Sequence, residues 1–375
     1  MTLLTSQTSE GSGSPPDADT PTAGSSSSLG PVPSGQLSSR ARVSGIARES
    51  QASAARRDRD NNRLHITADS MRLSVNHRYK HFQAPIVTFE WDMHDLWHTY
   101  YLASKHISAQ HPAQDRLALQ LIALKGQGVL NRPNPKKESA TTAIEVEEAM
   151  TANGRIWADL PFLVGDMTQY WITDFPKMSA AQRLNFAQFL AKLAKVSLIA
   201  EDDLCGIGLV VLRDALETTR PLGQMQLEEG AVIHAIDEED VLRRAHDISI
   251  AGLLPSANAW LFEAGAKLIQ LSDQNWNNCT TASGIAGEPI GMHAPGFSSQ
   301  RWLYWLRRLE EIANAAASHS PDLSDYAAKM VGNMLAAVEE ADDASLVKRA
   351  VRENRSATDK RNHAHIQLLG APGHG

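Results

Sequence analysis

The segment His94-Asp95-Leu96-Trp97-His98 holds the side chains whose types and spacing come closest to a metal site. Histidines four residues apart share one face of a helix, where both imidazoles could bind one metal ion with an acidic residue between them as base. Zinc proteases of this type carry glutamate at the second position, because its longer side chain reaches the metal-bound water, and Asp95 departs from that pattern. Since no third ligand is identifiable, we interpret the pair as part of a solvated helix face and predict neither a metal nor another cofactor.

Other motifs for cofactor or nucleophile chemistry are incomplete. Cys205-Gly-Ile-Gly208 offers a Gly-x-Gly, but Val211 stands where a dinucleotide fingerprint needs its third glycine, and no strand precedes it. The sequence has no Gly-Lys dipeptide for a phosphate-binding loop and no Gly-x-Ser-x-Gly elbow. Cys205 lies in an apolar run, and Cys279 has no base nearby. We therefore identify no catalytic residue and favour a protein that is not an enzyme.

Tryptophans recur beside charged residues at three places along the chain. Such pairs would line the concavity of a small-molecule site between helices. In a folded core the same pairs would be buried anchors with satisfied caps and ion pairs, and we favour this interpretation. Glu263 gives the sharpest expectation, because a carboxylate on an apolar helix must find an Arg or Lys partner or carry a raised pKa. The candidate binding residues are Trp157, Asp159, Trp260, Glu263, Arg301, Trp302 and Trp305.

Composition limits the classes of partner. The 375-residue chain has a formal net charge of −7, whereas binding to nucleic acid or anionic lipid needs clustered Lys and Arg. We therefore expect neither nucleic acid nor membrane as a partner. The 2 cysteines are too far apart for a disulfide framework or a thiolate zinc cage. No signal peptide and no run of about 18 apolar residues occurs, which predicts a soluble protein of the cytoplasm or the nucleus.

Low-complexity sequence predicts three parts. Residues 11–35 are nearly all Ser, Gly, Pro, Thr and Asp, which offer too little apolar surface to offset the entropy of ordering. The Arg-rich stretch that follows contains interleaved acidic residues, so we interpret it as a solvated linker rather than a docking arm. We expect a disordered tail over 1–85, a helical domain over 86–343 and a basic segment over 344–375 that is largely disordered at its end.

Helices are the elements expected in that domain. An aromatic stripe predicts a helix from about Phe89, a second helix ends at Gly126 and Gly128, and a short polar helix should cover 142–150. A further helix is expected to follow Asp159, run through Tyr170 and Trp171 and stop near Pro176, and a long one to follow Ser179 and include 184–193. The others are expected near 204–216, 237–246, 255–271, 298–317 and 320–340, with a polar loop over 272–296.

Their starts are predicted from capping signals. Asp159 is a candidate N-cap with Pro161 in the first turn, Ser179 and Gln182 form a capping-box pattern, and Pro255 should open its helix. About eight to ten helices without alternating β-branched runs predict an all-α fold, an irregular multi-helix bundle.

An ordered series of landmarks resembles the fungal domain-of-unknown-function family numbered 3632. The landmarks span roughly 91–317 and include Leu96-Trp97, Gln114-Asp115-Arg116-Leu117, Trp157-Ala-Asp-Leu-Pro161, Leu184-Asn185, Leu212-Arg213-Asp-Ala-Leu-Glu217, Ala259-Trp260 and Arg301-Trp302. The resemblance implies a fungal source and a single helical domain. It implies no reaction, because the family has no assigned activity.

Two functional hypotheses from different classes remain. The first is a non-catalytic helical module that binds an unidentified protein partner through its outer surface. The alternative is a small-molecule-binding protein or metal-independent enzyme of a fungal metabolic pathway, with its pocket lined by the tryptophan and charge clusters. A deep cavity with Glu263 or Arg301 pointing into it would favour the alternative.

Overall fold

The computed structural model describes residues 63–134, 146–199, 203–225, 247–278 and 296–356. Ten helices account for most of these residues, and the strands are short and antiparallel, which confirms a mostly α fold. The helices cover 63–82, Val87–His106 (α2), Pro112–Gly126 (α3), Leu163–Asp174 (α4), Ala180–Lys195 (α5), Cys205–Leu216 (α6), Ile250–Asp273 (α7), Ser299–Ala316 (α8), Pro321–Glu340 (α9) and 346–356.

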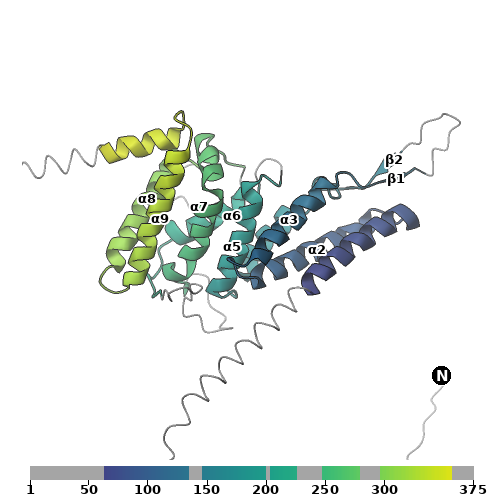
Figure 1. Ribbon diagram of the computed structural model, residues 1–375, viewed down its shortest axis with the longest axis horizontal. Helices are drawn as coiled ribbons and strands as arrows, with labels where there is room; N and C mark the ends of the chain where they lie inside the picture. The colour runs from purple at the N-terminus through teal and green to yellow at the C-terminus, as the bar shows by residue number, and fades with distance from the viewer. Residues whose placement is uncertain (1–62, 135–145, 200–202, 226–246, 279–295, 357–375) are drawn as a thin grey trace, which may run out of the picture. The chain divides into compact units, whose positions relative to one another are not determined.

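Helix α5 is central to the packing. It contacts α2 and α3 on one side and α6 and α7 on the other. Helices α3, α5, α7 and α9 form a row in which each packs against the next, and Figure 1 shows α3, α7 and α9 following one another across the molecule. The buried apolar side chains of these helices belong to one core. None of the helices within the described ranges is long and apolar enough to cross a bilayer.

Capping signals place several helix ends where the sequence predicts them. Ser179 Oγ accepts from Gln182 N at 3.2 Å and Gln182 Oε1 accepts from Ser179 N at 3.0 Å, so the capping box is present. Ser298 Oγ accepts from Arg301 N at 3.2 Å and begins α8. Gly128 follows α3 with a φ of 72°, the left-handed conformation that glycine adopts readily.

Two predicted helix starts are wrong. Helix α7 begins at Ile250, so Pro255 lies inside it. Ser249 Oγ accepts from Gly252 N at 3.3 Å, and this cap, with burial of the first turn, outweighs the hydrogen bond that proline cannot donate. Helix α4 begins at Leu163, and Asp159 accepts from Arg155 instead of capping it.

The described part of the predicted polar helix over 142–150 is β-structure. The strands are Asn131–Pro133 (β1), Val146–Glu148 (β2), Met150–Thr151 (β3) and Gly154–Arg155 (β4), with β1 pairing β2 and β3 pairing β4. Backbone partners distant in sequence explain the difference, because Ala149 N donates to Leu130 O at 2.8 Å. Helical spacing in the sequence gives no information on such a partner.

Two helices lie where the sequence predicted tails. Helix 63–82 buries Val75 and Tyr79, and Tyr79 Oη donates to Glu147 O at 2.9 Å. Helix 346–356 buries Val347, whose N–H donates to Asp273 Oδ1 at 2.9 Å. The ordered core therefore begins before Phe89 and continues beyond residue 343. The predictions for residues 1–62, 237–246, 279–295 and 357–375 lie outside the described residues.

Candidate functional site

A buried centre of charged residues joins α6 to α8. Arg213 lies in the last turn of α6, Glu217 is the C-cap residue of that helix, and Arg301 lies in the first turn of α8. Glu217 Oε1 is 2.9 Å from Arg301 Nε, and Glu217 Oε2 is 3.5 Å from Arg213 Nε. The side chains of Glu217 and Arg301 are each 1% exposed and that of Arg213 is 4% exposed. These three residues are called the buried centre below.

Aromatic groups and a chain connection complete the buried centre. Trp305 Nε1 donates to Glu217 Oε1 at 2.8 Å, and the Trp305 ring meets the edge of Phe297 at 6.2 Å between centroids. Arg301 Nη1 donates to Gly296 O. Phe297 N donates to Trp276 O at 2.8 Å, which joins the two ends of the connection between α7 and α8. The buried centre therefore fixes the point where the chain enters α8.

The contacts of Glu217 indicate a structural role in joining α6 to α8 rather than the role of a general base. Burial raises the pKa of this carboxyl, while Arg301, the Trp305 N–H and Arg213 act to lower it. A general base must come within about 3 Å of the proton that it removes. Glu217 Oε1 accepts from Trp305 Nε1 and lies 2.9 Å from Arg301 Nε, so the partners of this oxygen are themselves buried groups of the fold.

The candidate residues from the third tryptophan cluster lie at this centre, whereas Trp260 of α7 packs against α6. The rings of Trp302 and Trp305 are 6.4 Å apart, and both side chains are fully buried. Trp260 is also fully buried and packs on α6, where a Cβ on Gly208 would lie 2.6 Å from the indole. Gly208 therefore permits close packing of α7 on α6.

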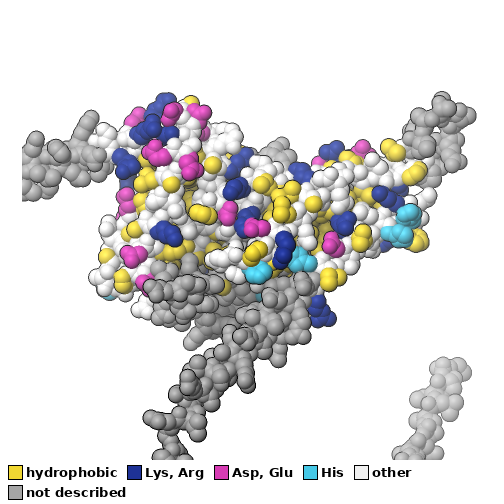
Figure 2. All heavy atoms as spheres, in the orientation of Figure 1, with side chains coloured by type: hydrophobic (Ala, Val, Ile, Leu, Met, Phe, Trp, Pro, Cys, Tyr) yellow, Lys and Arg dark blue, Asp and Glu magenta, His cyan; other side chains and the backbone are white. Residues whose placement is uncertain are grey.

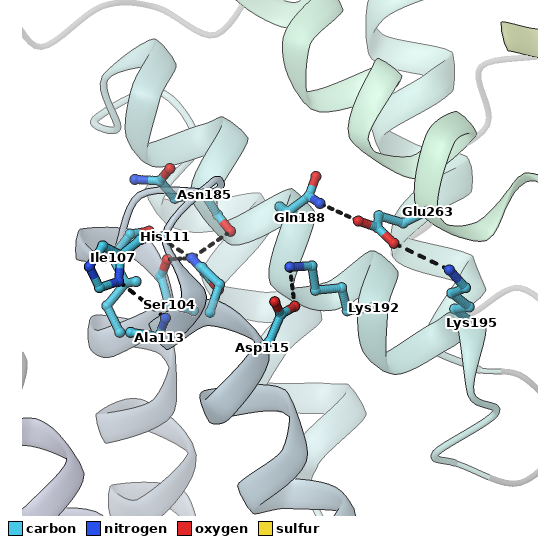
Figure 3. Close-up of polar contacts among 11 residues, drawn as sticks. Ser104, Ile107, His111, Ala113, Asp115, Asn185, Gln188, Lys192, Lys195 and Glu263 are labelled. Atoms are coloured by element: carbon cyan, nitrogen blue, oxygen red, sulfur yellow. Dashed lines mark hydrogen bonds and ion pairs between the residues drawn. The ribbon is translucent and has the colours of Figure 1, made fainter. Parts of the chain in front are cut away.

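Glu263 lies on a different side of α7, facing α5. Gln188 Nε2 donates to Glu263 Oε1 at 2.6 Å, and Lys195 Nζ lies 3.6 Å from Glu263 Oε2 (Figure 3). The expected cationic partner is therefore Lys195. The contact joins α5 to α7 at the molecular surface, since the Lys195 side chain is 59% exposed.

Trp157 and Asp159 belong to a third, separate group. Trp157 Nε1 donates to Asn76 Oδ1 at 2.7 Å, and Asp159 forms an ion pair with Arg155 at 2.9 Å. Hydrogen bonds from Arg155 lower the pKa of Asp159. Trp157 also has a φ of 64°, a left-handed conformation that is strained for a bulky residue. The seven candidates thus divide among the buried centre, the contact of Trp260 with α6, the α5–α7 contact and the 154–159 segment.

Polar side chains of α2 and α4 pair with one another along the contact between these helices, which we call the α2–α4 seam. The sequence did not predict these pairs. His94 Nδ1 lies 2.7 Å from Asp166 Oδ2, and the His98 ring lies 5.5 Å from that of Tyr170. Asp166 and Tyr170 occupy successive turns of α4, so they match the spacing of the two histidines. The interpretation as a solvated face is therefore incomplete, because His94 has a carboxylate partner.

Near the C-terminal ends of α2 and α4, this seam contains the amine of Lys105, the phenol of Tyr101 and the carboxylate of Asp174. Tyr101 Oη donates to Asp174 Oδ2 at 2.8 Å, and Lys105 Nζ donates to Tyr101 Oη at 3.1 Å. Burial lowers the pKa of Lys105 and raises that of Asp166, and it raises the pKa of Tyr170 to about 12. Within the ranges that the structure describes, no three His, Cys, Asp or Glu side chains are grouped to bind a metal ion.

Comparisons with known proteins agree with the landmark order in the sequence. A family model described as "Protein of unknown function (DUF3632)" matches residues 97–309. A protein of Penicillium oxalicum, named "Oxopyrrolidines biosynthesis cluster protein G", is 36% identical over 279 residues, which cover 70% of this chain and 74% of that protein. No solved structure matches significantly. The resemblance inferred from the landmarks is therefore confirmed.

Proposed function

Because this chain belongs to the family described as "Protein of unknown function (DUF3632)", we propose its role from its own geometry: a non-catalytic protein-interaction module that serves a fungal biosynthetic pathway. The name of the Penicillium relative, a biosynthesis cluster protein, supports the pathway part of the proposal. The interaction part rests on the outer surface of three neighbouring helices.

Ion pairs between neighbouring helices organise this surface. Lys192 Nζ lies 2.6 Å from Asp115 Oδ1, which links α5 to α3. One turn further along α5, Lys195 reaches Glu263 on α7. Figure 3 shows Lys192 directed toward Asp115, and Gln188 and Lys195 directed toward Glu263. We call this surface the α3–α5–α7 face.

Large apolar side chains stand beside each of these ion pairs. Leu119 lies one turn after Asp115, Val196 one turn after Lys192, and Phe262 precedes Glu263. The three are between 52% and 69% exposed. Apolar anchors surrounded by polar groups are the pattern of protein interfaces. Figure 2 likewise shows hydrophobic side chains interspersed with both signs of charge on the face in view.

The proposal rests on the contrast between the exposed apolar side chains of this face and the charged residues buried inside the fold. Glu217 and Arg301 contact each other inside the fold, whereas Phe262 projects from the surface. An exposed aromatic side chain held on a rigid helix contributes large contact area with little loss of conformational entropy on binding.

Affinity purification of the tagged full chain from its own host tests the proposal. We expect a stoichiometric protein partner with the wild type and at least a tenfold loss with Leu119→Ser combined with Phe262→Ser, because tenfold corresponds to about 1.4 kcal/mol of binding free energy. Ile66→Ser is the matched control, since Ile66 is 66% exposed on helix 63–82. Equal recovery of all proteins by the wild type and the double variant would contradict the proposal.

The α2–α4 seam favours a second candidate function, a small-molecule-binding protein or metal-independent enzyme. Groups with shifted pKa values gather at functional sites, and Lys105 and Asp166 are such groups. Native mass spectrometry of the full chain discriminates the candidates. A retained small-molecule mass that disappears in Lys105→Met but persists in Phe262→Ser would support the second candidate.

A further inference from the structure

Two pairs of histidines in this chain have the same spacing of four residues. His94 and His98 lie on α2, and His77 and His81 lie on helix 63–82. Side chains four residues apart share one face of a helix, so this spacing allows the two imidazoles of a pair to bind one metal ion. The two pairs differ in what their rings contact.

The rings of the α2 pair contact α4 and its N-cap residue, Phe162. His94 Nδ1 lies 2.7 Å from Asp166 Oδ2, and the His94 ring lies 4.6 Å from that of Phe162. The His98 ring lies 5.5 Å from that of Tyr170. One nitrogen of His94 is therefore already paired with a carboxylate, and both rings take part in the packing of α2 against α4.

The rings of the pair on helix 63–82 contact each other. The ring centroids of His77 and His81 are 4.7 Å apart, and the Phe82 ring meets that of His77 edge-on at 5.2 Å. Both histidines are exposed, and among the residues that the structure describes neither side chain has a hydrogen-bond partner. Their ring nitrogens are therefore accessible to an ion from solution.

The separation of these two rings fits a pair of imidazoles on one metal ion. A bound imidazole nitrogen lies about 2.0–2.1 Å from the metal, and the ring centre lies about 1.1 Å beyond that nitrogen. Two rings that meet at one ion at about 90–110° therefore have centroids about 4.5–5.2 Å apart. The 4.7 Å between His77 and His81 lies in this range. Only rotation of the rings is needed to direct one nitrogen of each toward the same ion.

The position of the pair in its helix also favours a cation. The helix ends one residue after His81, so both histidines lie in its last two turns. The C-terminal end of a helix carries a partial negative charge, which stabilises a positive charge nearby. Of the neighbouring cations, Arg78 lies 2.9 Å from Asp92 on α2 and is paired there. Lys80 is exposed, and its long side chain can extend into solvent.

We propose that His77 and His81 together bind one divalent transition-metal ion, with Cu²⁺ bound more tightly than Ni²⁺ or Zn²⁺. Imidazole nitrogens suit these ions, and affinity at a given site rises toward Cu²⁺. Mg²⁺ and Ca²⁺ prefer oxygen ligands and should not bind here. Water completes the coordination, and the bound ion links the last two turns of helix 63–82.

Calorimetric titration of the full chain with CuCl₂, in a buffer that does not bind metal, tests this proposal. We expect the Kd of one site to rise at least tenfold in His77→Ala and in His81→Ala, because only a pair of imidazoles gains from intramolecular binding of the second ligand. His98→Ala is the matched control, since it removes an exposed histidine of the same spacing from α2 and should leave that Kd unchanged. Thermal unfolding of the three variants without metal should match the wild type.

Moving one histidine tests whether the spacing determines the affinity. His81→Ala combined with Phe82→His keeps two histidines on the helix but places them about 140° apart around its axis. This variant should bind Cu²⁺ no better than His81→Ala alone, because the two rings point to different sides of the helix.

Three results overturn the proposal. They are wild-type affinity in the variant with the moved histidine, equal titrations of the wild type and His77→Ala, and a wild type that binds no Cu²⁺ at micromolar concentrations. Loss of Cu²⁺ binding in His98→Ala with His77→Ala unaffected would assign the ion to α2 and also overturn it. Phe262→Ser should leave the titration unchanged, so loss of the host partner in that variant bears only on the α3–α5–α7 face.

Discussion

Two sets of ion pairs in this molecule use the same chemistry in opposite surroundings. In the buried centre, Glu217 and Arg301 are each 1% exposed. On the α3–α5–α7 face, each pair has one exposed member. Asp115 is 64% exposed beside Lys192 at 15%, and Lys195 is 59% exposed beside Glu263 at 16%. A charge removed from the buried set leaves its partner in a medium that cannot solvate it, whereas water replaces a lost partner on the surface. Burial therefore separates charges that hold the fold from charges available to a partner.

Replacement of Glu217 by alanine should have the largest effect. It leaves Arg213 and Arg301 buried without their carboxylate and removes the acceptor of Trp305 Nε1, so the free energy of unfolding should fall by about 3–5 kcal/mol. Urea denaturation measures this fall as a lower midpoint at unchanged slope. A loss no larger than that of Glu263→Ala would refute the distinction between the two sets.

Asn185→Ala should have an intermediate effect, because Asn185, labelled in Figure 3, is buried and makes two hydrogen bonds. Its Oδ1 accepts from Ala109 N at 2.8 Å and its Nδ2 donates to Lys105 O at 3.1 Å. Truncation leaves the buried Ala109 N–H without this acceptor, at a cost of about 1–3 kcal/mol. Thermal unfolding of Asn185→Ala and of Gln188→Ala compares the loss of a buried amide with the loss of a half-buried one. Equal melting temperatures would contradict the expected dependence of the cost on burial.

Glu217→Gln sharpens the comparison through its pH dependence. It should cost less than Glu217→Ala, because glutamine keeps the size of the side chain and an acceptor for Trp305. Burial raises the folded pKa of Glu217 above its ordinary value of 4.5, so folding favours the protonated carboxyl. The wild type should therefore gain stability relative to Glu217→Gln as pH falls from neutral through the folded pKa, and lose it as pH rises. Parallel stability curves for the two proteins would show that Glu217 does not titrate in this way.

Lys195→Ala should have the smallest effect. Its ammonium lies 3.6 Å from Glu263 Oε2 and is exposed, so its loss should cost no more than about 0.5 kcal/mol. Salt screens such a pair, and the difference from the wild type should vanish at about 1 M salt, where the Debye length is about 3 Å. Chemical denaturation in urea at low and high salt measures both quantities. A larger, salt-independent loss would place Lys195 with the structural charges.

Local signals explain which helices the sequence predicts correctly. Ser179 and Gln182 stand three residues apart and cap each other, so a pattern of four residues predicts the start of α5. Helix 63–82 was not predicted, because the Arg-rich composition before it is typical of a solvated linker. Its apolar stripe includes Val75 and Tyr79, but Tyr79 finds its hydrogen-bond acceptor at Glu147, far along the chain.

The candidate site was predictable only in part for the same reason. Arg301 and Trp305 attract attention because tryptophan and arginine recur within two turns of one helix. Glu217 caps the end of a helix whose apolar sequence is typical of buried core, and its partner Trp305 is 88 residues away. Sequence spacing reports neighbours on one helix, whereas a buried ion pair between helices depends on how they pack.

The hydrogen bond from Phe297 N to Trp276 O also marks a position at which another domain could be inserted into this protein. It joins the two ends of a connection, and doubling the length of a closed connection costs only about 0.6 kcal/mol. A fluorescent or affinity domain grafted between these two residues should therefore leave α7 and α8 in place. The same tolerance gives evolution a position at which relatives can acquire new sequence without disturbing the packing of α7 and α8.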